Sequence, residues 1–198
     1  MKNNKSCKVT EFAKHEFDLL LPMERDFVEV NRALVHEARI VQELSDVSIP
    51  GEAASISRVE DVICSNADNI FVFRKNDEIV GLYAMLMLRS VGLERLLLGE
   101  FDGVNPDLIS LSRTGETPAA IYVWSYVAPG LAADGVRYVS QFLQQPKYRN
   151  INFFARPVTK EGVRITLNFG YEPIETVGGG LYRYVRLVNR EPKLQRAA

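Results

Sequence analysis

The sequence of 198 residues has few of the residues that build metal centres and disulfide frameworks. It contains two cysteines, Cys7 and Cys64, two histidines and one tryptophan. Neither cysteine stands at metal-binding spacing from another ligand, and two cysteines do not make a disulfide framework. A single bridge between them is conceivable, but a reduced pair is the interpretation we favour. We therefore expect no metal site.

Long apolar segments and a strong net charge are also missing. No run of about 18 apolar residues occurs, so we expect no membrane span. Residues 1–6 (MKNNKS) lack the apolar stretch of a signal peptide. The formal net charge is -1, which gives no global attraction to nucleic acid or to an anionic membrane. These absences predict a cytoplasmic protein that binds neither.

The residues that are present suit one globular domain. Hydrophobic residues make up 46% of the chain and charged residues 25%, enough apolar material for a sizeable core. We expect a single domain over residues 1–198, with loose termini at 1–6 and 189–198.

The clearest pattern lies in the second half of the chain. Residues 121–127 (IYVWSYV) predict a buried strand that ends at the Pro-Gly pair 129–130. Apolar residues then recur at helical spacing over 132–143, and 152–155 predict a second strand. A short helix is expected over 159–170, begun by Thr and ended by Gly. Strand, helix, strand, helix in this order predicts a sheet that contains a parallel pair.

The first half gives weaker patterns. An apolar stripe predicts a helix over 24–44 with a surface histidine, His36. The pair Ser57 and Glu60 suggests a capped helix as far as Cys64. The other expected elements are an edge strand at 8–12, a hairpin of 69–74 and 78–88 turning at Asn76-Asp77, a strand at 93–98, a short helix near 106–111 and a strand at 181–188.

Three short motifs resemble the GCN5-related N-acetyltransferase (GNAT) superfamily. Val127-Ala128-Pro129 is similar to the V-x-P end of the family's central strand. Gly135 falls on the first glycine of the R/Q-x-x-G-x-G/A loop that opens the next helix. Phe169-Gly170-Tyr171-Glu172 resembles the family's terminal G-F/Y element. The sequence is thus similar to a divergent member of this superfamily.

The resemblance implies an α/β (α+β) fold, with a mixed, mostly antiparallel central sheet flanked by helices and a V-shaped strand splay after Val127. It implies acetyl-CoA or another acyl-CoA as substrate, with pantetheine in the splay and pyrophosphate on backbone N–H groups at a helix N-terminus. The implied CoA-binding residues are Val127, Leu131, Ala132, Ala133, Gly135, Val136 and Arg137.

The loop departs from the family pattern at three positions. Ala132 replaces Arg or Gln, and Arg137 replaces the second small residue. Asp134 lies in the first helical turn, where a carboxylate stabilises an empty helix by about 0.3–1 kcal/mol but repels a phosphate. Arg137, one turn on, can offset that repulsion.

Catalytic candidates are few, because the strand 121–127 carries no carboxylate. Glu100 and Asp102 are candidate bases if their loop folds inward. The family's general-acid tyrosine, four residues before the terminal glycine, corresponds to Thr166, whose hydroxyl is a poorer acid than a phenol with a pKa of about 10. Tyr171 is the nearest phenol in the sequence. A basic cluster of Arg156, Lys160 and Arg164 could meet a nucleotide phosphate.

Regular alternation would put Tyr122, Trp124 and Tyr126 on one face of the strand, where they could line an acceptor pocket. Packing in the core is the commoner role for aromatic residues on a central strand.

Three functions remain open. The first is an N-acyltransferase that moves an acyl group from CoA to the amine of a small molecule or peptide. The second is a catalytically silent GNAT-fold module that binds a ligand or protein. The third is an acyltransferase with an acyl carrier protein as donor. A homodimer through edge strands is conceivable.

Overall fold

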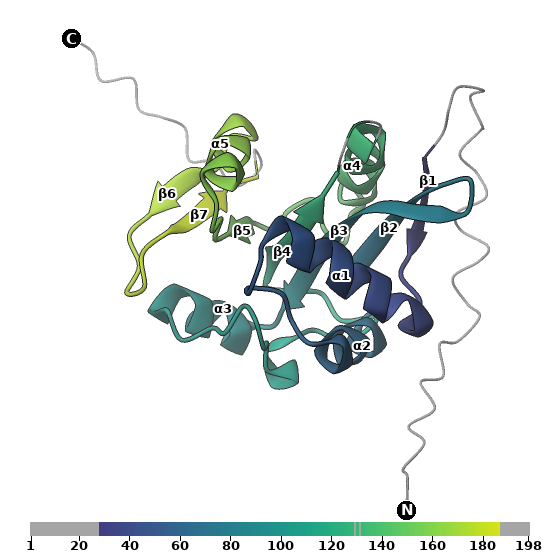
Figure 1. The fold of residues 1–198 in the computed structure, drawn as a ribbon. Coiled ribbons are helices and arrows are strands. Elements are labelled where there is room, and N and C mark those ends of the chain that lie inside the picture. Colours follow the sequence, from purple (N-terminus) through teal and green to yellow (C-terminus); the bar gives the residue numbers. More distant parts are fainter. Residues whose placement is uncertain (1–27, 129, 131, 187–198) are drawn as a thin grey trace, which may run out of the picture.

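The computed structural model describes residues 28–128, 130 and 132–186, and the side chains of Ala132 and Ala133 are not described. A seven-stranded mixed sheet with strand order β1-β2-β3-β4-β5-β7-β6 forms the centre (Figure 1). The strands are β1 (Glu29–Arg32), β2 (Ile70–Lys75), β3 (Glu78–Leu88), β4 (Ala120–Val127), β5 (Phe153–Ala155), β6 (Glu172–Ile174) and β7 (Leu181–Tyr184). Only the β4–β5 pair is parallel. This confirms the α/β fold class with a mostly antiparallel sheet.

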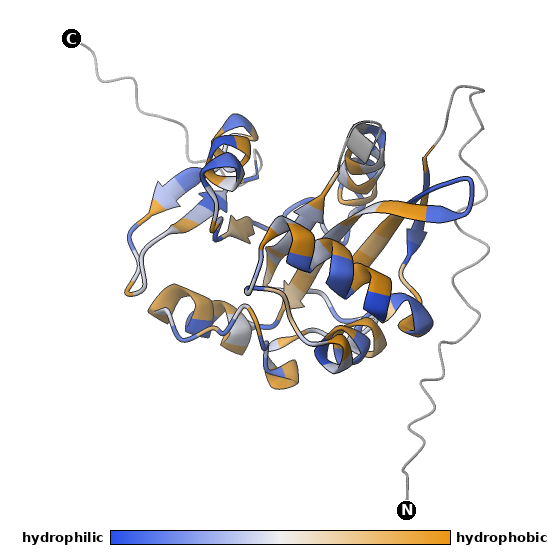
Figure 2. Ribbon diagram, viewed as in Figure 1, coloured by the Kyte–Doolittle hydropathy of each residue, from blue (hydrophilic) through white to orange (hydrophobic). Residues whose placement is uncertain are grey.

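Helices cover both faces of the sheet. They are α1 (Ala38–Ser48), α2 (Ile56–Ser65), α3 (Ser90–Leu98), α4 (Ala132–Phe142) and α5 (Lys160–Asn168), with 3-10 turns η2 (Val35–Glu37) and η3 (Leu108–Ser110). Side chains of α1, α2 and α3 pack in one core cluster, and those of α4 in a second cluster. Strands β2 and β3 are apolar along most of their length, whereas the helices alternate apolar and polar faces (Figure 2). This pattern is expected when a sheet is buried on both sides.

The β2–β3 hairpin forms as its sequence predicts. Asn76 and Asp77 have φ angles of 51° and 64°, which suit a two-residue turn with both central residues in the left-handed region. The pairing shifts between Phe73 and Arg74, which face Gly81 and Ile79. Val80 is therefore the extra residue of a bulge in β3.

A second bulge lies in β4 at Trp124. Ala84 pairs with Ser125 and Met85 pairs with Val123, so Trp124 has no partner in β3. Trp124 packs against the α1–α3 cluster, as Tyr122 does two residues earlier. Tyr126 instead contacts the ring of Tyr83, which belongs to the α4 cluster. The prediction that three aromatic side chains share one face is confirmed for Tyr122 and Trp124 and was wrong for Tyr126, because the extra residue in the bulge changes the alternation after Trp124.

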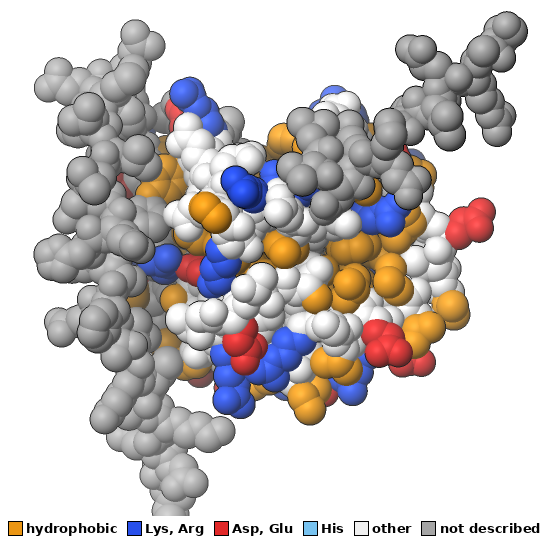
Figure 3. Space-filling model, turned by 180° about the vertical axis from the view of Figure 1, so that it is seen from behind, with side chains coloured by type: hydrophobic (Ala, Val, Ile, Leu, Met, Phe, Trp, Pro, Cys, Tyr) orange, Lys and Arg blue, Asp and Glu red, His pale blue; other side chains and the backbone are white. Residues whose placement is uncertain are grey.

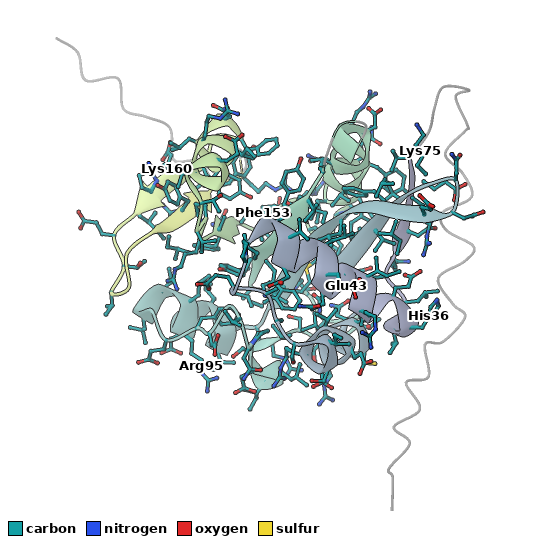
Figure 4. All side chains as sticks on the ribbon, viewed as in Figure 1. His36, Glu43, Lys75, Arg95, Phe153 and Lys160 are labelled. Atoms are coloured by element: carbon teal, nitrogen blue, oxygen red, sulfur yellow. The ribbon has the colours of Figure 1, made fainter. Side chains whose placement is uncertain are left out.

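The predicted helix over 24–44 was also wrong. Residues 29–32 form β1, which pairs antiparallel with β2, and the helix begins only at Ala38. Hydrogen bonds to β2, a segment about forty residues later, outweigh the helical periodicity of this segment. His36 lies on η2 with 77% of its side chain exposed, far from β5 and α5 (Figure 4), which confirms the surface assignment.

Two further expectations need correction. Residues 93–98 belong to helix α3, which Gly99 ends with a φ of 76°, and do not form a strand. Gly92 allows this helix to pack, because a Cβ there would lie 2.4 Å from the backbone oxygen of Ser110. Helix α2 begins two residues earlier than expected: Ser55, not Ser57, accepts a hydrogen bond from the Arg58 N–H as N-cap.

Several expectations lie outside the described residues. These are the strand at 8–12, the loose termini 1–6 and 189–198, and the positions of Cys7, Pro129 and Leu131. Within the described part of the chain, no helix is long and apolar enough to cross a membrane.

Candidate active site

The splay between β4 and β5 is the central feature of the site. The parallel ladder joins Ile121–Val123 to Phe153–Ala155 and ends there. From Trp124 onwards, the edge of β4 that faces β5 has no strand partner among the described residues, so the two strands separate before Val127. Backbone groups on such an edge can bind an extended ligand, as added strands do.

A cavity of about 600 Å³ occupies this splay. Its walls come from both faces of the sheet, since Tyr122 and Trp124 belong with the α1–α3 cluster and Tyr83 with the α4 cluster. The loop after α3 closes one side, where Trp124 Nε1 donates to the Gly103 oxygen at 2.5 Å. The ring of Phe101 meets that of Tyr122 edge-on at 5.5 Å between centroids. Aromatic surface therefore forms much of the wall.

A smaller cavity of about 280 Å³ lies on the α4 side of the sheet, lined by Val136, Ser140 and Arg186 among others. Three side chains line both cavities: Tyr83, Phe169 and Tyr171. We call these three the aromatic partition, because they stand between the two spaces. A hydrogen bond joins the hydroxyls of Tyr83 and Tyr171.

The phenols of the partition remain protonated at neutral pH. Burial raises the pKa of Tyr171 well above 10, and the neighbouring Tyr83 hydroxyl raises it further. Burial likewise raises the pKa of Tyr83. Each phenol is thus a hydrogen-bond donor at the point where the two cavities meet.

Arg156 follows the last residue of β5 and contributes the cationic group of the main cavity. Its Nε and Nη2 atoms are buried and have no hydrogen-bond partner within the described residues. Arg156 as a whole is half-buried, but its two buried N–H groups give up hydration without a hydrogen bond in exchange, which is costly. The site is therefore arranged for a group that can accept from these two nitrogens.

Three carboxylates line the same cavity. Asp102 accepts from the backbone N–H groups of Val104 and Asn105, and Glu161 pairs with Arg164 at 2.5 Å. Glu52, exposed on the loop between α1 and α2, has no side-chain hydrogen bond or ion pair among the described residues. Only Glu52 is therefore unengaged by the described part of the fold.

The start of α4 is shaped by packing. Gly135 is buried, and a Cβ there would lie 2.6 Å from the ring of Phe73 on β2. Asp134 and Arg137 are exposed in the first turns, and Gly130 has a φ of 58°. Gly135 thus lets α4 approach the sheet, whatever the loop binds.

The residues predicted from the sequence lie in different places. Thr166 and Tyr171 line the main cavity, whereas Glu100 is exposed and is not part of its wall. Val136 lines the smaller cavity, and Val127 is at the end of β4. Leu131 is outside the described residues. Ala132, Ala133, Gly135 and Arg137 lie in the first half of α4.

Sequence reasoning missed Glu52 and gave Arg156 a different role. Arg156 was grouped with Lys160 and Arg164 around α5, but only Arg156 lines the cavity; Lys160 lies on the outer side of α5 (Figure 4). A single arginine directly after a strand was the one available signal. No group of three or more His, Cys, Asp or Glu in the described ranges could hold a metal ion.

The face opposite to the view in Figure 1 carries interspersed positive and negative side chains (Figure 3). This agrees with the net charge of -1. The visible part of that face has no broad field of one sign.

Comparison with known proteins identifies the fold. No protein-family model and no curated protein sequence matches the chain. The loading GNATL domain of CurA from Lyngbya majuscula superposes with a TM-score of 0.58 at 11% identity, over 80% of this chain and 98% of that chain.

Two other solved structures are similar. The GphF GNAT-like decarboxylase in complex with isobutyryl-CoA has a TM-score of 0.56 at 11% identity, over 79% of this chain and 98% of that one. Ard1 from Thermoplasma volcanium has a TM-score of 0.53 at 8% identity, over 81% and 98%. Together with the sheet order and the splay, these similarities show that the chain has the GNAT fold.

Proposed function

We propose that the protein transfers an acyl group from a CoA thioester to the amine of a small molecule or peptide. The observation that carries this proposal is the cavity that passes through the β4–β5 splay, with an unpaired strand edge beside it. A solved structure of the same fold is a complex with isobutyryl-CoA, which supports a CoA thioester as donor.

The donor half of the proposal uses backbone groups. The free edge of β4 as far as Val127 would pair with the pantetheine amides. The pyrophosphate would meet the N–H groups at the start of α4, where the helix dipole favours negative charge. Leu131, Ala132, Ala133, Gly135, Val136 and Arg137 are the other residues proposed to surround the CoA.

The acceptor half requires proton transfer. The amine nitrogen attacks the thioester carbonyl, a C–N bond forms and the C–S bond breaks. Glu52 would accept the proton that the amine releases. The Tyr171 hydroxyl, kept protonated by burial, would stabilise the leaving thiolate by donating a hydrogen bond, and the thiolate would take its proton from solvent. Thr166 would offer a further hydroxyl for hydrogen bonding on the cavity wall. Glu100 does not line the cavity, so it could serve as a base only if its loop moved inward.

A second candidate is a GNAT-fold module that binds ligands without catalysis. The aromatic partition favours it, because Tyr83, Phe169 and Tyr171 occupy the splay through which a pantetheine arm would run. The carrier-protein donor is a third candidate, and the similarity to a loading GNATL domain is its support. CoA binding separates the first two, because the module needs no thioester.

The test is isothermal titration with acetyl-CoA and with free pantetheine. We expect Asp134→Asn to tighten acetyl-CoA binding about two- to five-fold and Arg137→Gln to weaken it by a similar factor. Neither change should affect pantetheine, which has no pyrophosphate. Both side chains are exposed, so the fold should not change.

Glu94→Gln, an exposed change on α3, is the matched control and should leave both affinities unaltered. If acetyl-CoA does not bind at millimolar concentration, CoA-dependent transfer is excluded and the binding module gains support. If it binds, mass spectrometry of a panel of primary amines then identifies the acceptor.

A further inference from the structure

The guanidinium of Arg156 has a chemical counterpart elsewhere in the molecule. Arg89 follows β3 just as Arg156 follows β5, and its Nε and Nη2 hold the two carboxylate oxygens of Glu116 at 2.9 and 2.7 Å. The same two nitrogens of Arg156 have no partner in the described part of the chain. An arginine fork of this geometry matches a carboxylate. The vacant fork therefore indicates that a ligand brings one.

The surroundings of Arg156 keep the fork at the cavity. The β6–β7 turn covers one side, where a Cβ on Gly178 would lie 3.5 Å from Arg156 Nη2 and a Cβ on Gly180 would lie 4.0 Å from its Cγ. Tyr122 is close on the cavity side, since the charge of Arg156 lowers the pKa of this phenol against the larger, raising effect of burial. The guanidinium thus lies between a glycine-rich turn and an aromatic wall.

Glu52 provides the opposite charge within reach of the same wall. Its carboxylate also acts on Tyr122, in the direction that raises the phenol's pKa. The other two cavity carboxylates, Asp102 and Glu161, are engaged as described above. The cavity thus presents one vacant cation and one unengaged carboxylate near the Tyr122 ring, with no ion pair between them. This arrangement matches a ligand with one positive and one negative group.

We propose that the acyl acceptor is an amino acid, whose carboxylate binds the fork of Arg156 and whose amine lies towards Glu52. This inference rests on the proposed acyl transfer. The aromatic walls formed by Phe101, Tyr122 and Trp124 favour an apolar or aromatic side chain in the remaining space. Arg156 is then a specificity-determining residue that touches the acceptor and takes no proton.

The experiment compares acceptors that differ only in the carboxylate. With acetyl-CoA as donor, L-phenylalanine and L-leucine are tested against their amides and their decarboxylated amines. Wild-type protein should prefer the free amino acids at least ten-fold in kcat/KM. In Arg156→Met the ratio of kcat/KM for the free amino acid to that for its amide should fall to about one, while transfer to the decarboxylated amines and the affinity for acetyl-CoA persist. In Arg156→Lys this ratio should lie between those of the wild type and Arg156→Met. Arg149→Met, at an exposed arginine after α4, should behave as wild type.

Binding of the same compounds without acetyl-CoA keeps the inference testable when no transfer occurs. A thermal shift with L-phenylalanine, absent with its amide and lost in Arg156→Met, would support the amino acid site even if acyl transfer fails. Equal use or equal binding of acid and amide overturns it. A carboxylate effect seen only with malonyl-CoA as donor would also overturn it, because the fork would then hold the acyl group.

Discussion

Arg89 and Arg156 each directly follow a strand of the sheet, but only Arg89 has a carboxylate partner within the described chain. Arg89, after β3, is bound on both nitrogens by Glu116, which the chain supplies 27 residues later. Arg156, after β5, has the same nitrogens buried without a partner among the described residues. The first fork fastens a loop to the body of the fold. The second is left vacant beside a cavity, which is how a binding group differs from a structural one.

The polar groups around β2 and β3 follow the pattern of Arg89. Asn69 is fully buried, donates to the oxygens of Val62 and Ser65, and accepts from the Met87 N–H. Asp68 accepts from Arg32 at 2.9 Å and from the Tyr148 hydroxyl. The chain itself therefore satisfies the buried side chains of Asn69 and Asp68, whereas the fork of Arg156 has no such partner among the described residues.

The largest expected effect is the loss of a satisfied group. Asn69→Leu leaves the Met87 N–H without its side-chain acceptor and removes the bonds that Asn69 donates to Val62 and Ser65, which should lower the free energy of unfolding by about 2–4 kcal/mol. Urea denaturation measures it. Asn31→Leu, at an exposed position on the edge strand β1, should change it by less than about 0.5 kcal/mol. An equal loss in both variants would contradict the comparison.

The next prediction tests whether Gly135 matters for packing or for CoA binding. Gly135→Ala places a Cβ 2.6 Å from the Phe73 ring, and such overpacking costs about 1–3 kcal/mol, less the helix propensity gained. In a double-mutant cycle, Phe73→Leu should relieve part of this loss. Acetyl-CoA affinity should stay within about two-fold of wild type when the variant is folded. A stability unchanged by Gly135→Ala would show that the close contact is not maintained in solution.

A smaller effect compares the two forks directly. Arg89→Met should lower the midpoint of thermal unfolding, because Glu116 loses its partner. Arg156→Met should leave the midpoint unchanged or raise it, since an apolar side chain of similar length replaces two buried N–H groups that have no partner among the described residues. Differential scanning calorimetry without ligand measures both. A large destabilisation by Arg156→Met would mean that the fork is structural.

The smallest effect is the pH dependence of the Arg89 fork. Hydrogen bonds from Arg89 lower the pKa of Glu116 from 4.5 to about 2. A carboxylate whose pKa is lower in the folded than in the unfolded state stabilises the fold at pH values above its unfolded pKa. This stabilisation is lost as the pH falls from about 4.5 towards 2. Arg89→Met should therefore have a shallower loss of stability than wild type across that window. An identical slope in the two proteins would contradict the assignment.

The sequence was sufficient where local pattern and tertiary structure agree. The elements β4, α4, β5 and α5 were predicted from local signals, which are the Pro-Gly pair after β4 and the Thr and Gly that begin and end α5. The turn between β2 and β3 follows from Asn76-Asp77. The strand β1 was missed because its identity depends on pairing with β2, about forty residues away in the sequence. Such long-range pairing overrides local periodicity.

The site was less predictable than the fold for the same reason. Glu52 and Arg156 are about a hundred residues apart in the sequence and line one cavity because β4 and β5 separate beside the α1–α2 loop. Neither residue has a local motif. Whether an arginine has a hydrogen-bond partner depends on the positions of all donors and acceptors around it. It is therefore visible in the structure and not in the sequence.

The bulge at Trp124 has a consequence for how the cavity wall can vary. Substitutions in β4 exchange one wall residue at a time. Trp124 and the next residue, Ser125, both lie on the α1 side of the sheet, where Ser125 meets Ser45 at 3.0 Å. Removal of Trp124 alone would restore regular alternation and leave Ser125 opposite Ala84 and Tyr126 against Tyr83. The wall would lose one aromatic side chain while its neighbours kept their faces, so relatives without this residue should accept larger ligands.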